Sequence, residues 1–141
     1  MGTHTFKYAI FPHRANEFET IESINEQCEK FHYPLLALRR KNSDELKLED
    51  SLLSLSSKAV VLSAIKESED EKAAIVRWWN PTPHESSTDL KLNAAVKSMA
   101  LAKLNEEEVS VLATDSNQNI PTGPYEIATI NVEFANNNKK R

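Results

Sequence analysis

The clearest hydrophobic pattern in the chain is a pair of apolar runs, residues 59–65 and 73–79, separated by a short charged loop. Both runs are rich in β-branched or aromatic side chains and are apolar on both faces, which is typical of central strands covered on both sides. A polar connection this short favours a β-hairpin. The pattern therefore predicts two neighbouring antiparallel strands.

The N-terminal part of the chain begins with a strand-like alternation. In residues 5–11, the apolar side chains Phe6, Tyr8 and Ile10 fall on one face. Pro12 would end such a strand, because proline has no N–H to donate to a ladder. We therefore predict a strand over residues 5–11.

A helical periodicity follows. Asn16 and Glu19 have the spacing of a capping box, and apolar residues then recur at helical spacing. We predict an amphipathic helix over residues 17–30 that packs against the body of the domain. Its apolar stripe consists of Phe18, Ile21, Ile24, Cys28 and Phe31. Because Cys28 lies on this stripe, we expect a small buried core residue rather than a reactive thiolate.

Shorter alternating segments occupy the rest of the chain, and each predicts a strand. Their apolar positions are Leu46 and Leu48, Leu53 and Leu55, Leu90 and Leu92, Val109 and Val111, and Ala128, Ile130, Val132 and Phe134 within the last strand, 125–134. Residues 99–104 fit either a strand or a helical turn. The total of roughly eight or nine short strands predicts an all-β fold, an antiparallel two-sheet β-sandwich with one short amphipathic helix near the N-terminus. We expect residues 1–135 to form this single domain and residues 136–141 to be a disordered tail.

Composition narrows the class of protein. The chain is 40% hydrophobic and 27% charged, as in a folded domain, and its net charge of -4 offers no positive field to nucleic acid or anionic lipid. We therefore expect no nucleic acid and no membrane as partners. Two glycines are too few for a phosphate-binding loop. The single cysteine is compatible with a reducing compartment, and we expect a cytoplasmic protein.

Acidic clusters at residues 67–71 and 106–108 contain the carboxylates that glycosidases use as acid and base. Both clusters lie in charged loops, with no adjacent apolar run to raise a pKa, so we interpret them as solvated turns. The four histidines are dispersed and lack metal-ligand spacing. The sequence therefore predicts no catalytic and no metal-ligating residue in this chain.

Arg77 and Trp79 are the candidate substrate-binding residues. Trp78 and Trp79 are adjacent in a predicted strand and point to opposite faces, so at most one of them can stack on a given sugar ring. We expect core packing for at least one. Arg77 is the odd polar residue of this strand; it can pair with a buried carboxylate or reach a neighbouring domain, and we favour structural pairing.

Several segments carry longer motifs. Residues 4–13 read HTFKYAIFPH, residues 60–70 contain SAIKESED, residues 75–82 contain RWWNPT, and residues 123–130 read GPYEIATI. In order and spacing they resemble the C-terminal region of glycoside hydrolase family 38 α-mannosidases, and the combination of SAIK with RWWNPT is the most specific part.

The resemblance implies a β-sandwich from the C-terminal part of such an enzyme. In that family an N-terminal α/β barrel carries the zinc site, the aspartate nucleophile and the acid/base carboxylate, and nothing in this chain matches the barrel motifs. We therefore expect the chain to be a piece of a retaining, zinc-dependent α-mannosidase, with no cofactor of its own and no activity alone.

Three classes of function follow. The leading hypothesis is a structural accessory domain, packed on the catalytic domain of the same polypeptide, in an enzyme that hydrolyses terminal α-linked mannose. The alternative is an independent module that binds mannosyl carbohydrate, and an unrelated adhesive β-sandwich is a third class. The expected ligand of the parent enzyme is an α-mannoside. Formation of a homo-oligomer stays open.

Overall fold

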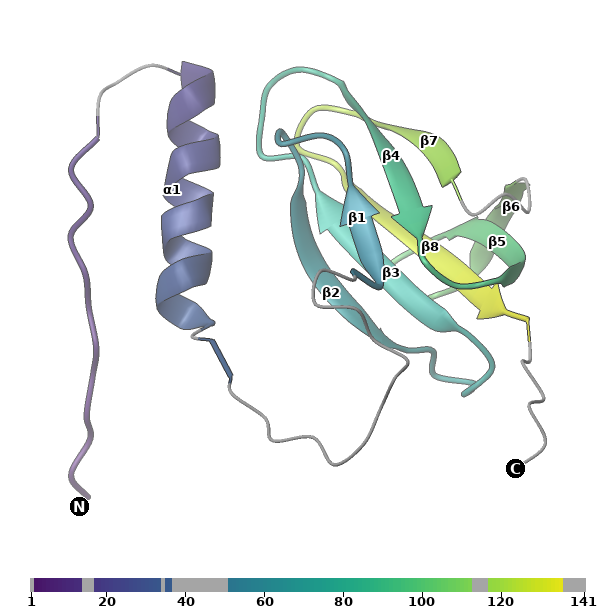
Figure 1. The fold of residues 1–141 in the computed structure, drawn as a ribbon, viewed down its shortest axis with the longest axis horizontal. Helices are drawn as coiled ribbons and strands as arrows, with labels where there is room; N and C mark the ends of the chain where they lie inside the picture. Colours follow the sequence, from purple (N-terminus) through teal and green to yellow (C-terminus); the bar gives the residue numbers. More distant parts are fainter. Residues whose placement is uncertain (1, 14–16, 34, 37–50, 113–116, 136–141) are drawn as a thin grey trace. The chain divides into compact units, whose positions relative to one another are not determined.

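The computed structural model describes residues 2–13, 17–33, 35–36, 51–112 and 117–135. The chain divides into two compact units, Met1–Ser43 and Asp44–Arg141, and each is described by itself (Figure 1). The single domain over residues 1–135 and the packing of the helix on it stay predictions. The strand expected at Leu46 and Leu48 and the expected tail lie outside the described residues. No helix in the described part of the chain is long and apolar enough to cross a membrane.

The N-terminal unit contains one helix in its described part, α1 (Glu17–His32), which confirms the predicted helix. Basic side chains, Lys30 and His32, lie in its last turn, where the helix dipole favours positive charge. Lys30 Nζ also lies 2.6 Å from Glu26 Oε1, one helical turn earlier. Both side chains are exposed, so this pair adds little to stability.

Two predictions for this unit are wrong. Residues 5–11 form neither helix nor strand, and Phe6, Tyr8 and Ile10 are 84%, 86% and 87% exposed. A strand needs a second strand for its hydrogen bonds, and the one regular element described in this unit is a helix whose backbone groups are already paired. Cys28 is exposed rather than buried, because it lines an open pocket between α1 and residues 7–13 instead of packing in a core.

The C-terminal unit is an antiparallel two-sheet β-sandwich, as predicted (Figure 1). Three strands form one sheet in the order β1-β4-β7, and five form the other in the order β2-β3-β8-β5-β6. The strands are β1 (Leu53–Leu55), β2 (Val61–Glu67), β3 (Ala74–Trp79), β4 (Ser86–Leu92), β5 (Val96–Ala102), β6 (Glu108–Leu112), β7 (Asn117–Thr122) and β8 (Ile127–Phe134).

The predicted hairpin is confirmed, because β2 and β3 are antiparallel neighbours with Val61 opposite Trp79. β3 is a central strand. The expectation that β2 is also covered on both sides is wrong, since β2 is an edge strand and its Leu62 and Ile65 are 38% and 49% exposed. Apolar content alone does not distinguish an edge strand that carries apolar side chains from a central one.

The other alternating segments within the described residues also form strands, namely β1, β4, β6 and β8. The ambiguous segment 99–104 falls largely within β5 and is a strand there. β7 was not predicted, because its sequence NQNIPT is mostly polar and contains Pro121. It is an edge strand of the smaller sheet, where a residue without an N–H is tolerated.

The core lies between the two sheets and is centred on Trp78, whose side chain is completely buried. Its Nε1 donates a hydrogen bond to Thr122 Oγ1 at 3.0 Å, which links the five-stranded sheet to β7 of the other sheet. A buried indole N–H requires such a partner. The surrounding core residues are Val60, Val76, Leu90, Leu92, Met99, Ile120, Ala128, Ile130 and Val132.

Replacing Trp78 by phenylalanine should destabilise the sandwich, because the change leaves a cavity and removes the donor that Thr122 accepts from. We expect the free energy of unfolding in urea to fall by about 2–4 kcal/mol. Trp79→Phe is the matched control at the adjacent, partly exposed position, and should cost less than about 1 kcal/mol. Equal losses at the two positions would contradict the role of Trp78 as the core anchor.

Candidate functional site

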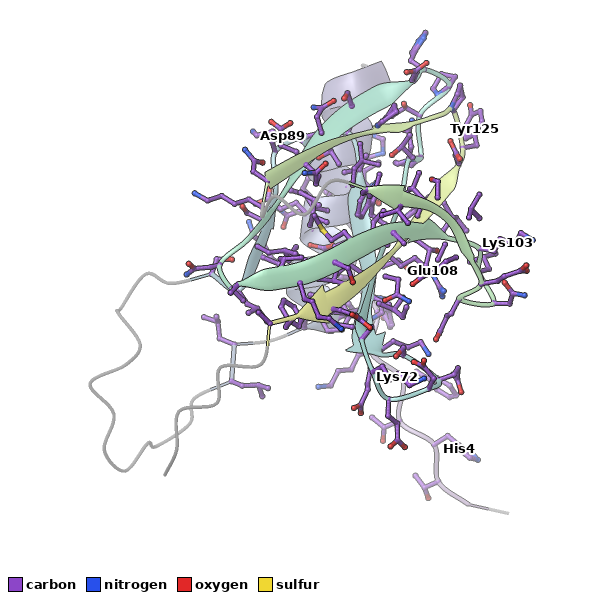
Figure 2. The ribbon with its side chains drawn as sticks, turned by 90° about the vertical axis from the view of Figure 1, so that its right-hand side faces the viewer. His4, Lys72, Asp89, Lys103, Glu108 and Tyr125 are labelled. Carbon is purple, nitrogen blue, oxygen red and sulfur yellow. The ribbon has the colours of Figure 1, made fainter. Side chains whose placement is uncertain are left out.

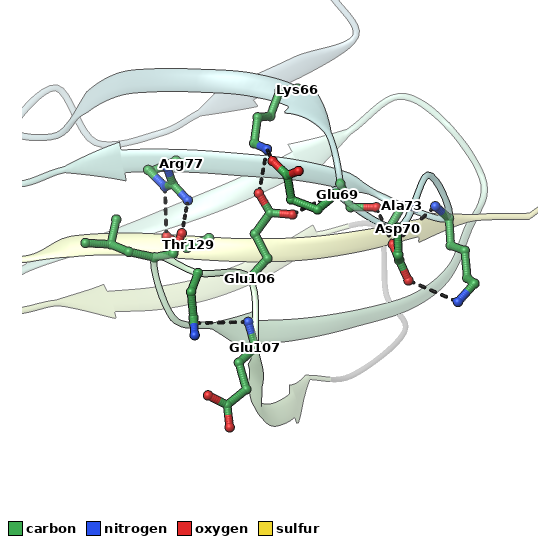
Figure 3. A network of polar contacts seen from close by, with 12 residues as sticks. Lys66, Glu69, Asp70, Ala73, Arg77, Glu106, Glu107 and Thr129 are labelled. Atoms are coloured by element: carbon green, nitrogen blue, oxygen red, sulfur yellow. Dashed lines mark hydrogen bonds and ion pairs between the residues drawn. The ribbon is translucent and has the colours of Figure 1, made fainter.

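A charged bridge lies on the outer face of the five-stranded sheet (Figure 3). Lys66 of β2 sits opposite Ile75 of β3. Ile75 precedes the core residue Val76, so Ile75 and Lys66 lie on the face of the sheet that points away from the core. Lys66 Nζ lies 2.6 Å from Glu106 Oε1 and 3.0 Å from Glu69 Oε1. The second carboxylate oxygen of Glu106 accepts a hydrogen bond from the backbone N–H of Glu69 at 2.8 Å. Glu106 thus joins the β5–β6 loop to the edge of the β2–β3 hairpin.

Arg77 of β3 holds the same loop. Its Nε donates to Thr129 Oγ1 at 3.1 Å, and its Nη2 donates to the carbonyl oxygen of Leu104 at 3.0 Å (Figure 3). Ile75 and Thr129 are 0% and 2% exposed although they lie outside the core cluster, because the loop covers this part of the sheet. The structure places Arg77 in a structural pairing, with a hydroxyl and a carbonyl as partners.

The turn that carries Glu106 has a constrained backbone. Its φ of 69° lies in the left-handed region, which residues with a Cβ seldom adopt. Hydrogen bonds from Glu106 N to Lys103 O and from Lys103 N to Glu107 O, both 2.9 Å, close the turn. Such a conformation persists only where the surroundings fix it. The ion pair with Lys66 and the bond from Arg77 provide that fixation.

The bridge stabilises the charged forms of its members. The hydrogen bond from Lys66 lowers the pKa of Glu106, and the Glu69 amide and the charge of Arg77 act in the same direction. Glu106 in turn raises the pKa of Lys66. A catalytic acid needs a raised carboxyl pKa, so this geometry suits a structural ion pair. The interpretation of Glu106 as part of a solvated turn is wrong, because its side chain is only 11% exposed.

A second polar cluster surrounds the buried side chain of Asn80, just after β3. Its Nδ2 donates to three carbonyl oxygens, those of His84 at 2.7 Å, Gly123 at 2.9 Å and Thr122 at 3.3 Å. Its Oδ1 accepts from the N–H of Thr82 at 3.0 Å and from the Thr82 hydroxyl at 2.7 Å. One amide side chain therefore connects the β3–β4 and β7–β8 connections.

The β7–β8 turn is shaped to fit this cluster. The backbone N–H of Tyr125 donates to Thr82 O at 3.2 Å, and Tyr125 has a φ of 55°. Gly123 donates its N–H to the Glu126 carboxylate. A Cβ at position 123 would lie 2.8 Å from Glu126 Oε2, so a larger residue would displace that side chain. Figure 2 shows Tyr125 and Lys72 at opposite ends of the sandwich.

Trp79 lies on the opposite side of β3 from Trp78, as the alternation of a strand predicts. It is 38% exposed and sits between Val61 of β2 and Ile127 of β8, the latter 47% exposed. We call Val61, Trp79 and Ile127 the Trp79 strip. Arg77 occupies the next outward position on β3, so the two candidate residues share one face, but Arg77 bonds to Thr129 and to the Leu104 carbonyl within the fold.

Sequence reasoning missed the two polar clusters. Lys66 follows the apolar run 59–65 and is itself followed by Glu67, so it reads as the start of the charged loop, and local sequence does not identify Glu106 as its partner. Asn80 directly follows an apolar run, and local sequence does not show that its amide joins two connections. Within the described residues, no group of three or more His, Cys, Asp or Glu side chains is arranged to hold a metal ion.

Comparison with known proteins gives one family. The model described as the glycosyl hydrolases family 38 C-terminal beta sandwich domain matches residues 59–130. The match begins just before β2, ends within β8, and includes both polar clusters. A search of curated proteins found no match.

The stability of the sandwich should fall as the pH is lowered through the titration of Glu106. Its pKa is lower in the folded protein than its ordinary value of 4.5, so the stabilisation is complete above that value and is lost at lower pH. Glu106→Gln should flatten the dependence of the melting temperature on pH below about 5. Glu107→Gln is the matched control, because the Glu107 carboxylate is 61% exposed in its pair with Lys103. Identical pH profiles for wild type and Glu106→Gln would contradict the bridge.

Asn80→Ala should strongly destabilise the domain, because three carbonyl oxygens and two Thr82 donors would lose their partner in a buried site. We expect a loss of about 3–5 kcal/mol in the free energy of unfolding, measured by chemical denaturation. Asn93→Ala is the control, since Asn93 is exposed and its backbone N–H, which the change keeps, donates to Leu52 O. A loss at Asn80 no larger than at Asn93 would show that the cluster does not hold the loops.

Proposed function

Because this chain belongs to the glycosyl hydrolase family 38 C-terminal β-sandwich domains, we propose that it is a structural accessory domain of an α-mannosidase. The parent enzyme hydrolyses terminal α-linked mannose. Its catalytic groups and its zinc ion lie in another part of the same polypeptide, and this chain packs on that part without carrying out the reaction.

One observation carries the proposal. Four polar residues in the motifs that resemble the family, Lys66, Arg77, Asn80 and Thr82, use their side chains to bond to other parts of the sandwich. Residues that served catalysis would leave reactive groups facing solvent or a cleft. Here these motif residues maintain the fold, as we expect for the motif residues of a domain that carries out no reaction.

The carboxylates support the same division of labour. A retaining glycosidase uses two carboxyl groups about 5 Å apart, one of which must hold a proton near neutral pH. Lys66 lowers the pKa of Glu106, and the Ser68 hydroxyl and Lys72 lower the pKa of Asp70. Both shifts favour the ionised form. These two groups therefore suit ion pairs and turns rather than proton donation.

We further propose that the Trp79 strip is the surface that packs on the rest of the enzyme. Its three side chains come from the adjacent strands β2, β3 and β8. Trp79 lies in the middle, with the apolar residues Val61 and Ile127 opposite it on the two neighbouring strands. A partly exposed tryptophan among aliphatic residues is typical of an interface anchor. A sugar site would need polar groups beside the aromatic ring to bind the hydroxyls, so the apolar surroundings favour packing over the carbohydrate-binding alternative.

The isolated chain should show no turnover of an aryl α-mannoside, with or without added zinc. Among the described residues, Glu106 and Asp70 have lowered pKa values and therefore do not suit the proton donor that the reaction needs. Release of the aryl group above a buffer blank is the measurement, and the full-length parent is the positive control. Turnover that survives purification and disappears on denaturation would refute the non-catalytic role.

In the full-length parent, Trp79→Glu should loosen the sandwich from the catalytic part. We expect proteolytic cleavage between the two to become at least about tenfold faster, since an aromatic interface anchor contributes about 2 kcal/mol. Leu52→Glu is the control. It changes an exposed leucine outside the Trp79 strip of the same unit and should leave the cleavage rate unchanged. Unchanged cleavage in Trp79→Glu, together with saturable tryptophan fluorescence changes in mannose or mannobiose titrations, would favour the carbohydrate-binding alternative.

A further inference from the structure

The backbone of residues 5–11 is extended and unpaired. The segment is neither helix nor strand and runs nearly straight in Figure 1. Near its two ends, the ring centres of His4 and Phe6 and those of Phe11 and His13 lie 6.4 Å apart. Side chains two residues apart lie side by side in this way when the backbone is extended. Within the described part of the chain, no hydrogen bond uses a backbone group of residues 5–11, so these groups are open to a second strand.

The segment also carries apolar side chains that the described part of its own unit leaves uncovered. Phe6, Tyr8 and Ile10 alternate along it and are 84%, 86% and 87% exposed. An alternating apolar row of this kind is typical of a strand that is covered on one face. The unpaired backbone and the exposed row therefore both indicate a missing strand-like neighbour.

The open pocket between α1 and residues 7–13 lies beside this backbone, within the N-terminal unit. Its volume is about 690 Å³, which is within the range of about 300–1,000 Å³ typical of ligand sites. Its apolar lining comes from both walls and consists of Tyr8, Ala9, Ile10, Phe11, Ile24 and Phe31. The pocket can therefore accept the apolar side chains of a chain laid along residues 5–11.

The charged groups that line this pocket are all basic. They are Lys7, His13, Lys30 and His32, and none of the lining residues carries a carboxylate. Lys30 is also paired with Glu26, which lies outside the lining. The whole chain has a net charge of -4, so the local excess of positive charge belongs to the pocket. It favours an occupant that carries carboxylates.

We infer that residues 5–11 and α1 form a docking site for an extended acidic peptide segment of a partner protein. The segment adds as a strand to the backbone of residues 5–11, its apolar side chains enter the pocket, and its carboxylates meet Lys7 and Lys30. A small anionic amphiphile would satisfy the charge but would leave the backbone unpaired, so the geometry favours a peptide. The inference concerns residues outside the matched range 59–130 and does not depend on the proposed function.

Binding of a synthetic peptide tests the inference. The probe is fluorescein-labelled Glu-Val-Glu-Ile-Glu-Val-Glu, and its binding to the full chain is followed by fluorescence anisotropy, where we expect saturation. One matched peptide has lysine in place of every glutamate, and another is N-methylated at its three central residues, which keeps the charge and side chains but removes the backbone donors. Each should bind at least about tenfold more weakly. Failure to saturate, or equal binding of either matched peptide, would overturn the proposal.

Cys28 shows where the peptide binds, because it lines the pocket, is exposed and is the single cysteine of the chain. Saturating acidic peptide should slow the alkylation of Cys28 by iodoacetamide at least about fivefold, by covering the thiol. Lys7→Glu should weaken peptide binding at least about fivefold. Lys91→Glu, at an exposed lysine of the sandwich, is the control and should leave binding unchanged.

Circular dichroism verifies that both variants are folded. Binding that leaves Cys28 unprotected would place the peptide elsewhere on the chain, and binding that responds equally to Lys7→Glu and Lys91→Glu would reflect only the net charge. Either result would overturn the proposal.

Discussion

The sandwich depends on how the chain crosses between its two sheets, and one buried amide fixes two of these crossings. β3 and β4 belong to different sheets, and so do β7 and β8. Asn80 bonds to carbonyl groups in both connections, at His84 and Gly123. Hydrogen bonds in a dry interior are strong because no water competes for them, and an unmade one is costly. The positions of both connections are therefore coupled to one side chain.

This constraint determines what lies on the outer face. With Asn80 fixed after β3 and the Trp78 indole bonded to Thr122, strand alternation turns Arg77 and Trp79 outward. Arg77 then bonds to the β5–β6 loop, and Glu106 in that loop pairs with Lys66. The centre of the outer face is covered by these contacts. Trp79, at the end of β3, stays 38% exposed.

The sequence predicts the parts of this fold that local burial determines. The β2–β3 hairpin is predicted by two continuous apolar runs, and β8 is predicted by alternating apolar residues because one side of it faces the core. β7 was missed because its pairing with β4, rather than its own apolar pattern, makes it a strand. Residues 5–11 show the opposite error, since the alternation is present without a pairing strand. Glu106 could not be predicted as a buried ion-pair member, because its partner Lys66 is brought close only by the tertiary fold.

In the described part of the chain, two of the three non-glycine residues with a left-handed backbone are acidic, and both lie in loops. Glu71, Glu106 and Tyr125 have φ values of 59°, 69° and 55°, in a conformation that glycine adopts most easily. At Glu106 the side chain offsets the strain by pairing with Lys66, and at Tyr125 the backbone N–H donates to Thr82 and joins the turn to the Asn80 cluster. A glycine at position 106 would relieve the backbone but lose the bridge. The position of the Glu106 carboxylate is therefore set by the turn and by Lys66, which lowers its pKa. A catalytic acid instead faces the substrate and has a raised pKa.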